Sequence, residues 1–259
     1  MGLSLDKISA QAPGLLSLAK TAIEVVDLSG LNGQKAKVAV ALDYSGSMYD
    51  VYRSGAMQRL VEKTLALATQ FDDDGSIDFF VFDSTAAYLG EISITDFAGS
   101  VDRLTRGRRM GSTNYSDAFL TIRNHFGFAP PAPPAPPKKG FFGLRKAQPA
   151  QSGAPASKPA DMPVYTLFLT DGSPDNKKAA IQALTEVSTA PIFWKFLSIG
   201  EQPMEFLEQL DTLQERFVDN ANYEPIGDVD AIGDSALFEK LLEEFPGWIR
   251  QVRSLGLIK

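Results

Sequence analysis

Three side chains whose chemistry suits a metal ion lie close together in the first quarter of the chain. Asp43, Ser45 and Ser47 occupy the stretch LDYSGSMYD, which overlaps the end of the apolar run KVAVALD (37–43). Aspartate and serine provide the hard oxygen ligands that Mg²⁺, Mn²⁺ and Ca²⁺ prefer. Alternate residues of an extended loop point the same way, and Gly46 lets the backbone turn sharply between the serines. The spacing therefore predicts three oxygens directed at one point.

Two further residues extend this group of oxygens. Asp171 lies near the end of the apolar run VYTLFLTDG (164–172), and Thr113 lies in the loop GSTN. The pattern D-x-S-x-S alone is a weak signal, because aspartate and serine are also common in turns and at helix caps. Asp171 likewise suits a cap for the helix expected near Ser173. With Thr113 and Asp171 added, the pattern predicts an octahedral cation site with room for water or an incoming ligand.

The elements that must position these side chains alternate between strands and helices. Short apolar runs predict strands, and apolar side chains three to four residues apart predict helices. We expect strands at 37–43, 76–83, 86–92, 164–172, 190–200 and 216–220, and helices at 12–28, 51–71, 95–104, 115–126, 173–187, 204–213 and 236–252. Ser173 and Pro174 suit a helix start, and Pro246 should kink the last helix. The alternation predicts an α/β fold with a doubly wound, mostly parallel sheet and helices on both faces.

The places of the two aspartates fit the way such sheets bind ligands. Ligands bind outside the carboxyl ends of the strands, at a topological switch point. Asp43 and Asp171 both stand at the carboxyl end of a predicted strand, so we expect the sheet to bring them together. The helix that follows Ser47 would then direct its N-terminus toward the same site.

The composition limits the kind of protein. The chain has 259 residues, of which 44% are hydrophobic, enough for one large α/β domain or two small ones with a real core. The absence of cysteine excludes disulfides, zinc–thiolate sites and thiol catalysis. The start of the chain lacks the pattern of a secretory signal, and no apolar run approaches the roughly 18 residues that a membrane span requires. We therefore expect a cytoplasmic protein.

The charge distribution argues against nucleic-acid binding. Five of the 25 basic residues and none of the 32 acidic residues lie between Ala129 and Ala160, so the rest of the chain carries 20 basic and 32 acidic residues. Nucleic-acid binding needs a basic surface that neutralises phosphates. An acidic body instead suits a cation site.

A segment rich in proline and alanine, 129–162, interrupts the pattern of strands and helices. It shows no hydrophobic periodicity, so the sequence predicts a disordered or polyproline-like insert. Within it, KKGFFGLRK (138–146) is either part of a solvated linker or a short segment that docks on a partner or on an anionic membrane surface.

The order of the five oxygen-bearing residues resembles the metal-ion-dependent adhesion site (MIDAS) of von Willebrand factor A (VWA) domains. D-Y-S-G-S, G-S-T-N and L-T-D-G match that motif in its order, and the predicted elements agree over about residues 36–255. The resemblance implies a Rossmann-like α/β fold with a central, mostly parallel six-stranded sheet. It also implies a partner carboxylate at the open coordination position of a divalent cation, usually Mg²⁺, with Ca²⁺ or Mn²⁺ as alternatives. Its implied ligands are Asp43, Ser45, Ser47, Thr113 and Asp171. Within the family, the opening KVAVALDYSGSMYD is most similar to bacterial VWA proteins of tellurium-resistance and stress-response clusters.

Residues 1–35 are expected to form a helical extension that packs on a VWA domain, 36–259, which the insert interrupts. The predicted function is metal-dependent binding of an acidic group on a partner protein in a bacterial tellurite or stress-response complex, without catalysis. Two alternatives stay open: a Mg²⁺-dependent phosphoryl-transfer or hydrolytic enzyme, and a purely structural metal site.

Three sequence features argue against the enzyme. A phosphoryl-transfer site usually has a second acid two residues after its nucleophile, where this chain has Ser45. No G-x-x-x-x-G-K-[ST] loop is present to hold a nucleotide. The sole histidine, His125, is far along the chain from both Ser45 and Ser47, so nothing marks it as a base for either serine.

Three arginines, Arg106, Arg108 and Arg109, lie just before Thr113. They are either solvated surface charges or a partner-binding group that steers an acidic protein and hydrogen-bonds its carboxylate.

Overall fold

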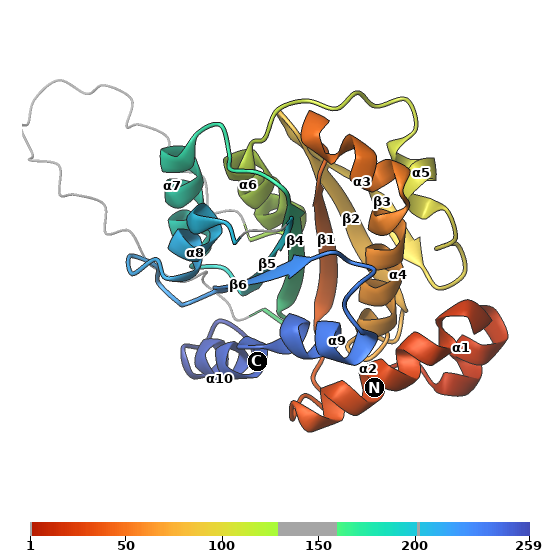
Figure 1. Cartoon of the computed structure of the whole chain (residues 1–259). Coiled ribbons are helices and arrows are strands. Elements are labelled where there is room, and N and C mark those ends of the chain that lie inside the picture. Colours follow the sequence, from red (N-terminus) through yellow and green to blue (C-terminus); the bar gives the residue numbers. More distant parts are fainter. Residues whose placement is uncertain (1, 129–159, 201–202) are drawn as a thin grey trace, which may run out of the picture.

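A six-stranded sheet forms the centre of the molecule (Figure 1). The computed structural model describes residues 2–128, 160–200 and 203–259. The strand order is β3-β2-β1-β4-β5-β6; β2 and β3 pair antiparallel, and all other neighbours pair parallel. The strands are β1 (Lys37–Asp43), β2 (Ser76–Phe82), β3 (Ala86–Ser93), β4 (Val164–Thr170), β5 (Ile192–Ile199) and β6 (Ala221–Gly227). The expected α/β fold with a mostly parallel six-stranded sheet is therefore confirmed.

Helices cover both faces of the sheet. They are α1 (Leu5–Gln11), α2 (Leu16–Leu28), α3 (Tyr49–Arg53), α4 (Ala56–Ala68), α5 (Ser100–Thr105), α6 (Tyr115–His125), α7 (Lys177–Val187), α8 (Glu205–Asp211), α9 (Asp234–Leu242) and α10 (Phe245–Ser254), with short 3₁₀ turns η1 (Pro13–Leu15) and η2 (Gly46–Met48). The apolar cluster on one face includes Leu60 of α4 and Trp248 of α10. The cluster on the other face includes Phe119 of α6 and Leu207 of α8. These two cores hold the strand ends in fixed positions.

The burial of the strands explains their composition. Every residue of β4 and all but the first of β1 are buried, which is why both strands read as unbroken apolar runs. The antiparallel edge strand β3 has only one fully buried residue, Ile92, and is correspondingly more polar. The two central strands are therefore the rigid support for whatever lies beyond their carboxyl ends.

The last strand begins later than the sequence predicts. We expect it at 216–220, whereas β6 covers Ala221–Gly227. Pro225 makes the sequence pattern argue against a strand here, because proline cannot donate a hydrogen bond within a sheet. The sheet tolerates Pro225 because β6 is an edge strand.

Three helices predicted as single elements are divided. The expected helix 12–28 consists of η1 followed by α2, and a further helix, α1, precedes it. The expected helix 51–71 is split into α3 and α4 at Gly55, whose φ of 79° lies in the left-handed region that glycine adopts without strain. The expected helix 236–252 is split into α9 and α10 at Glu244, which has a φ of 64°. Pro246 lies in the first turn of α10, so a break between two helices replaces the kink that we expect at this proline.

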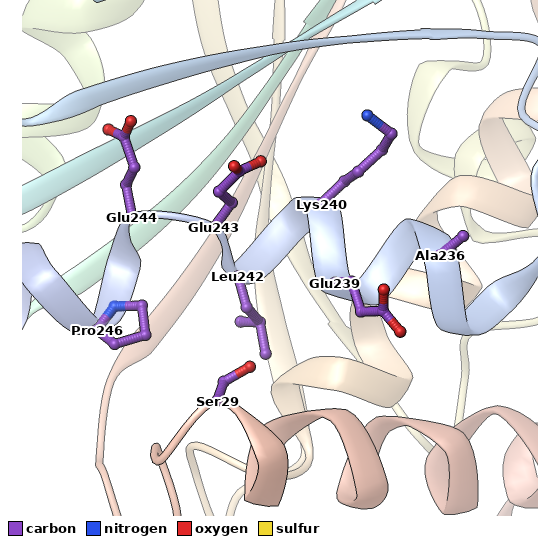
Figure 2. A pocket seen from close by; sticks show the side chains of 8 residues that line it. All are labelled: Ser29, Ala236, Glu239, Lys240, Leu242, Glu243, Glu244 and Pro246. Carbon is purple, nitrogen blue, oxygen red and sulfur yellow. The ribbon is translucent and has the colours of Figure 1, made fainter.

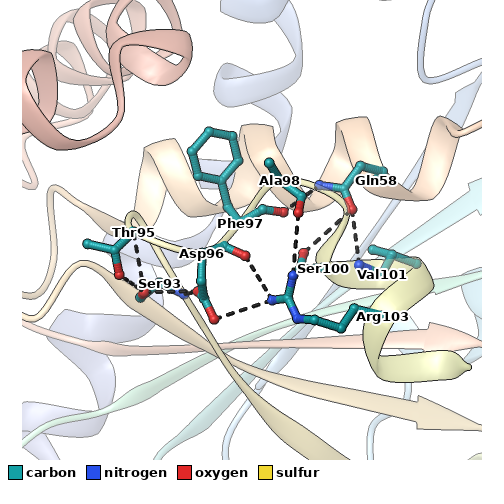
Figure 3. A network of polar contacts seen from close by, with 9 residues as sticks. All are labelled: Gln58, Ser93, Thr95, Asp96, Phe97, Ala98, Ser100, Val101 and Arg103. Atoms are coloured by element: carbon teal, nitrogen blue, oxygen red, sulfur yellow. Dashed lines mark hydrogen bonds and ion pairs between the residues drawn. The ribbon is translucent and has the colours of Figure 1, made fainter.

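A side-chain amide anchors α5 and the loop before it to α4 (Figure 3). Gln58 Nε2 donates to the carbonyl of Phe97 at 2.8 Å, and Gln58 Oε1 accepts from the amide of Val101 at 3.0 Å. Arg103 closes the same turn by donating to the carbonyl and the carboxylate of Asp96. This anchor fixes the start of the arginine-containing loop that runs on toward Thr113.

The predicted insert is described only at its end. Residues 129–159, including the segment 138–146, lie outside the described residues. Ala160 pairs with Ile258 in an isolated parallel bridge. In the described part of the chain, no helix has the length and hydrophobicity to span a membrane.

Candidate metal centre

The sheet places the ends of β1 and β4 side by side. Leu42 pairs with Leu169 in parallel register, so Asp43 and Asp171 follow at the same edge of the sheet. The carboxyl group of Asp43 is buried, with no exposed surface, and Asp171 is partly exposed just outside it. The two aspartates that the sequence singles out therefore lie at one strand-end site.

Four of the five candidate ligands are joined by a chain of short contacts. Asp43 Oδ1 accepts a hydrogen bond from the amide of Ser45 at 2.9 Å. Ser45 Oγ lies 3.1 Å from Ser47 Oγ, and Ser47 Oγ donates to Asp171 Oδ1 at 2.8 Å. The Ser45 amide and the two serine hydroxyls thus link two aspartates that are far apart in the sequence, and they bring four candidate ligands to one place.

The loop that carries the fifth residue, Thr113, is held against the same segment. The amide of Gly46 donates to the carbonyl of Gly111 at 3.2 Å, and the amide of Gly111 donates to the carbonyl of Tyr44 at 3.2 Å. On its other side, a Cβ at Gly111 would lie 2.9 Å from Ser84 Oγ, so the Ser84 side chain would have to shift to admit one. Thr113 itself is nearly buried, two residues further along.

A second contact fixes Thr113 from the side of Asp171. The amide of Asp175 donates to the Thr113 carbonyl at 2.9 Å, and the Thr113 amide donates to Asp175 Oδ2 at 3.3 Å. These two bonds hold Asp175 outside the following helix. Helix α7 therefore begins only at Lys177, and its cap is Asn176, whose side chain accepts from the amide of Ala179. The expected helix start at Ser173 and Pro174 is therefore wrong.

Burial dominates the electrostatics of Asp43. Burial raises the pKa of Asp43 to about 6, although hydrogen bonds from Thr170 and Ser45 act in the opposite direction. Thr170 Oγ1 donates to Asp43 Oδ2 at 2.6 Å, and it is a contact that the sequence pattern does not reveal. Burial and the nearby charge of Asp43 also raise the pKa of Tyr52, whose hydroxyl makes no hydrogen bond within the described residues.

The donor set fits a hard divalent cation. It consists of carboxylate and hydroxyl oxygens and contains no nitrogen or sulfur donor, which is the chemistry of Mg²⁺, Mn²⁺ or Ca²⁺ sites. Asp43 and Ser45 line the buried side, whereas Ser47 is exposed, so the site opens to solvent on one side. A bound cation would offset the uncompensated charge of Asp43 and leave a coordination position accessible.

The three arginines do not form one group. Arg108 is half-buried, with its Nη2 3.9 Å from Asp83 Oδ2, while Arg106 and Arg109 are exposed. Asp83 directly follows β2, the neighbour of β1. Arg108 therefore helps to hold its loop beside the site, and the other two are accessible to a partner.

The sole histidine has a packing environment. His125 Nε2 lies 3.0 Å from Asp78 Oδ1, and its ring packs on Phe80 and Tyr88. Asp78 belongs to β2 and pairs with Ala39, four residues before Asp43. His125 is thus engaged along the sheet, not at the strand ends, and supplies no base to Ser45 or Ser47.

Two other polar features lie apart from these ligands. Asp72, Asp73 and Asp74 form an acidic group, but Lys37 Nζ contacts Asp72 at 2.5 Å and Asp74 at 3.1 Å, so an ion pair accounts for it. A shallow hollow lies between the end of α2 and the junction of α9 and α10 (Figure 2). Its lining residues are Ser29, Ala236, Glu239, Lys240, Leu242, Glu243, Glu244 and Pro246, none of which is a candidate ligand.

Solved structures share the fold at low sequence identity. A structure of proximal thread matrix protein 1 from the mussel byssus aligns with a TM-score of 0.51 and 12% identity over 81% of this chain and 47% of that one. A structure of the same protein has a zinc-occupied MIDAS motif (TM-score 0.47, 12% identity, 81% and 46% coverage). The manganese-loaded Plasmodium vivax TRAP protein aligns with a TM-score of 0.49 at 13% identity, over 82% of this chain and 74% of that one. The chain thus spans about half the length of the mussel protein.

Sequence comparison gives a more specific relationship. The chain is 32% identical over 247 residues to the uncharacterized protein YcbR of Bacillus subtilis (strain 168), covering 94% of this chain and 90% of the relative. Residues 35–135 and 150–258 match the profile of the family described as the vWA domain found in the TerF C terminus. With most of its length matched, the chain belongs to the TerF-like vWA family.

Proposed function

We propose that this protein is a metal-dependent protein-binding module with a MIDAS-type site. In this proposal a divalent cation, Mg²⁺ or alternatively Ca²⁺ or Mn²⁺, is held by Asp43, Ser45, Ser47, Thr113 and Asp171. One coordination position faces solvent and takes a carboxylate from a partner protein. The chain would act in the cytoplasm, within a tellurite or stress-response complex.

The observation that carries this proposal is the chain of polar contacts from Asp43, through the Ser45 amide and the two serine hydroxyls, to Asp171. Each contact is between 2.8 and 3.1 Å, and together they join the ends of β1 and β4. In the metal-bound state the same oxygens would turn from one another toward the ion. The serines then act as ligands and not as nucleophiles, since His125 is engaged elsewhere.

The charges around the site support an anionic partner. Two carboxylates formally neutralise a divalent ion, so a water between Asp171 and the metal would leave it with more attraction for an incoming carboxylate. The exposed Arg106 and Arg109 follow α5 in the loop that leads to Thr113. They would steer an acidic partner and donate hydrogen bonds to its carboxylate.

The experiment has two stages. First, Mn²⁺ binding to the purified full chain is measured by calorimetry and electron paramagnetic resonance, for the natural protein and for Asp43→Ala. Second, both proteins are used to capture partners from a lysate of the source cell in Mg²⁺ and in EDTA. We expect one Mn²⁺ per chain, lost in Asp43→Ala, and a partner retained only by the natural protein in Mg²⁺.

Two results would decide for the alternatives. Metal binding that stabilises the fold without any metal-dependent partner would support a structural role. Mg²⁺-dependent turnover across a panel of phosphoesters and nucleotides, lost in Asp43→Asn, would support an enzyme. Capture that persists in EDTA would rule out coordination as the binding mechanism.

A further inference from the structure

Behind the candidate ligands lies a buried hydrogen-bond network that connects the segments carrying them. We propose that Thr170 and Tyr115 are positioning residues of the cation site, whose hydroxyl groups hold the ends of β1 and β4 and the start of α6 in one fixed arrangement. This inference rests on the proposed function for its role, but the network itself is a property of the metal-free chain.

The distances assign a direction to each hydrogen bond. Thr170 Oγ1 has one proton, and its nearest acceptor is Asp43 Oδ2 at 2.6 Å, compared with the Gly172 carbonyl at 3.1 Å. A carboxylate is also the stronger acceptor, so the proton belongs to Asp43. Thr170 Oγ1 is then free to accept from the amide of Gly172 at 3.2 Å.

Tyr115 completes the network from the opposite side. Its hydroxyl is within hydrogen-bonding distance of the Gly172 carbonyl and lies 3.2 Å from Thr170 Oγ1. Because the Thr170 proton is directed at Asp43, the Gly172 carbonyl is left for the Tyr115 proton. Tyr115 and Thr170 have no exposed surface, so these donors are not shared with solvent.

The network joins each segment that contributes a candidate ligand. Gly172 directly follows Asp171, so its two backbone bonds fix the Asp171 loop. Tyr115 is two residues after Thr113 and forms the first turn of α6. Thr170 bonds to Asp43 itself. One hydrogen bond on each Asp43 oxygen leaves lone pairs for the metal or its water, so positioning does not block coordination.

The chain offers matched variants for a test. Thr170→Val keeps the shape of the side chain and removes the hydroxyl, Thr170→Ser keeps the hydroxyl, and Tyr115→Phe removes the second donor. Thr166 provides the control, because it is a fully buried threonine of the same strand whose hydroxyl has no hydrogen-bond partner within the described residues. Thr166→Val therefore makes the same chemical change outside the network.

Mn²⁺ affinity of the full chain is the first readout. Changes to residues that orient metal ligands typically cost roughly 10–100-fold in affinity. We expect a loss of this size for Thr170→Val and about tenfold for Tyr115→Phe, with Thr170→Ser and Thr166→Val within about threefold of the natural protein. If Thr170→Val and Tyr115→Phe bind Mn²⁺ as tightly as Thr166→Val, the positioning role is wrong.

Hydrogen–deuterium exchange of the metal-free chain is the second readout and does not depend on the proposed function. We expect Thr170→Val to speed exchange in 43–47, 111–115 and 171–176 together, while Thr166→Val leaves these segments unchanged. Faster exchange confined to 171–176 would overturn the linkage between segments. If the natural chain binds no Mn²⁺ at all, the proposed function fails, whereas the exchange result still decides whether the network positions these segments.

Discussion

Replacing the buried carboxylate of Asp43 by an amide should stabilise the metal-free protein while removing its response to metal. Burial raises the pKa of Asp43 from 3.8 to about 6. A shift of about two units corresponds to roughly 3 kcal/mol, which is the upper limit of the cost of keeping this group ionised in the folded chain. The introduced amide is neutral at every pH, so Asp43→Asn should recover up to that amount above pH 7.

The pH dependence has a definite sign. The folded state binds the Asp43 proton more tightly than the unfolded state, so the stability that the proton provides is fully present below about pH 4. It is lost as the pH rises through about 6. The advantage of Asp43→Asn over the metal-free natural chain should therefore be largest at pH 7.5 and small at pH 4.

The site offers partners to the oxygen and to one N–H of the introduced amide. The oxygen of the introduced amide can accept from the backbone amide of Ser45, as Asp43 Oδ1 does. Its amino group would then face Thr170 Oγ1, which can accept that bond and donate its own proton to the Gly172 carbonyl, 3.1 Å away. The change therefore removes a charge and keeps both existing contacts, while the second N–H of the amide has no acceptor among them, so the net gain should stay below the upper limit.

Urea unfolding in EDTA, followed by tryptophan fluorescence, measures the effect, because Trp194 and Trp248 are both buried. We expect Asp43→Asn to raise the free energy of unfolding by 1 to about 3 kcal/mol at pH 7.5. Metal at 100 times its Kd should add about 2.7 kcal/mol to the natural chain and nothing to the variant. Asp50→Asn, at an exposed residue nearby, controls for the loss of a negative charge.

Two results would refute this reasoning. Asp43→Asn could be less stable than the natural chain in EDTA at pH 7.5, which would mean that the ionised carboxylate stabilises the fold. Alternatively, the variant could retain the full stabilisation by metal, which would mean that Asp43 is not a ligand.

Other parts of the structure lead to three further predictions. Burial lowers the pKa of Lys195 from 10.5 to about 8, so the unfolded chain keeps a proton that the folded chain loses. Stability should therefore rise by up to about 2 kcal/mol from pH 8 to 10, and urea unfolding of Lys195→Met should lack most of this rise. Asn176→Ala should cost about 1 kcal/mol in the same assay because it removes the cap of α7, whereas equal effects of Asn176→Ala and Ser173→Ala would contradict the observed helix start. Charge reversal of Arg106 and Arg109 should slow partner association and weaken its salt dependence in surface plasmon resonance while leaving Mn²⁺ affinity within a few fold; an unchanged association rate would remove their steering role.

The sheet could be predicted from the sequence because its signals are local. The central strands are buried on both faces and read as continuous apolar runs, and Asp43 and Asp171 stand visibly at their ends. That the two strands are neighbours then follows from the topology of doubly wound sheets, whereas the register, Leu42 with Leu169, comes from the structure. The position of the last strand could not be predicted in this way, because Pro225 argues against a strand unless the strand is known to lie at an edge.

The supporting part of the site could not be predicted, because its contacts join distant segments. Thr170 reads as one more β-branched residue in a strand, and only the fold shows that its hydroxyl meets Asp43, 127 residues earlier. Asp175 reads as a turn residue, yet it clamps Thr113 from 62 residues away. The break at Glu244 has no glycine to mark it, so the pattern of apolar residues continues across it as though one helix were present.

A crystal structure of the full chain soaked in Mn²⁺, with anomalous scattering used to locate the ion, tests the central claim most directly. We predict a single strong peak between Asp43, Ser45, Ser47 and Thr113, within coordination distance of their side-chain oxygens, with Asp171 bound directly or through water. A crystal without a peak at this site, or one in which the only peak lies at the acidic group around Asp72, would contradict the account.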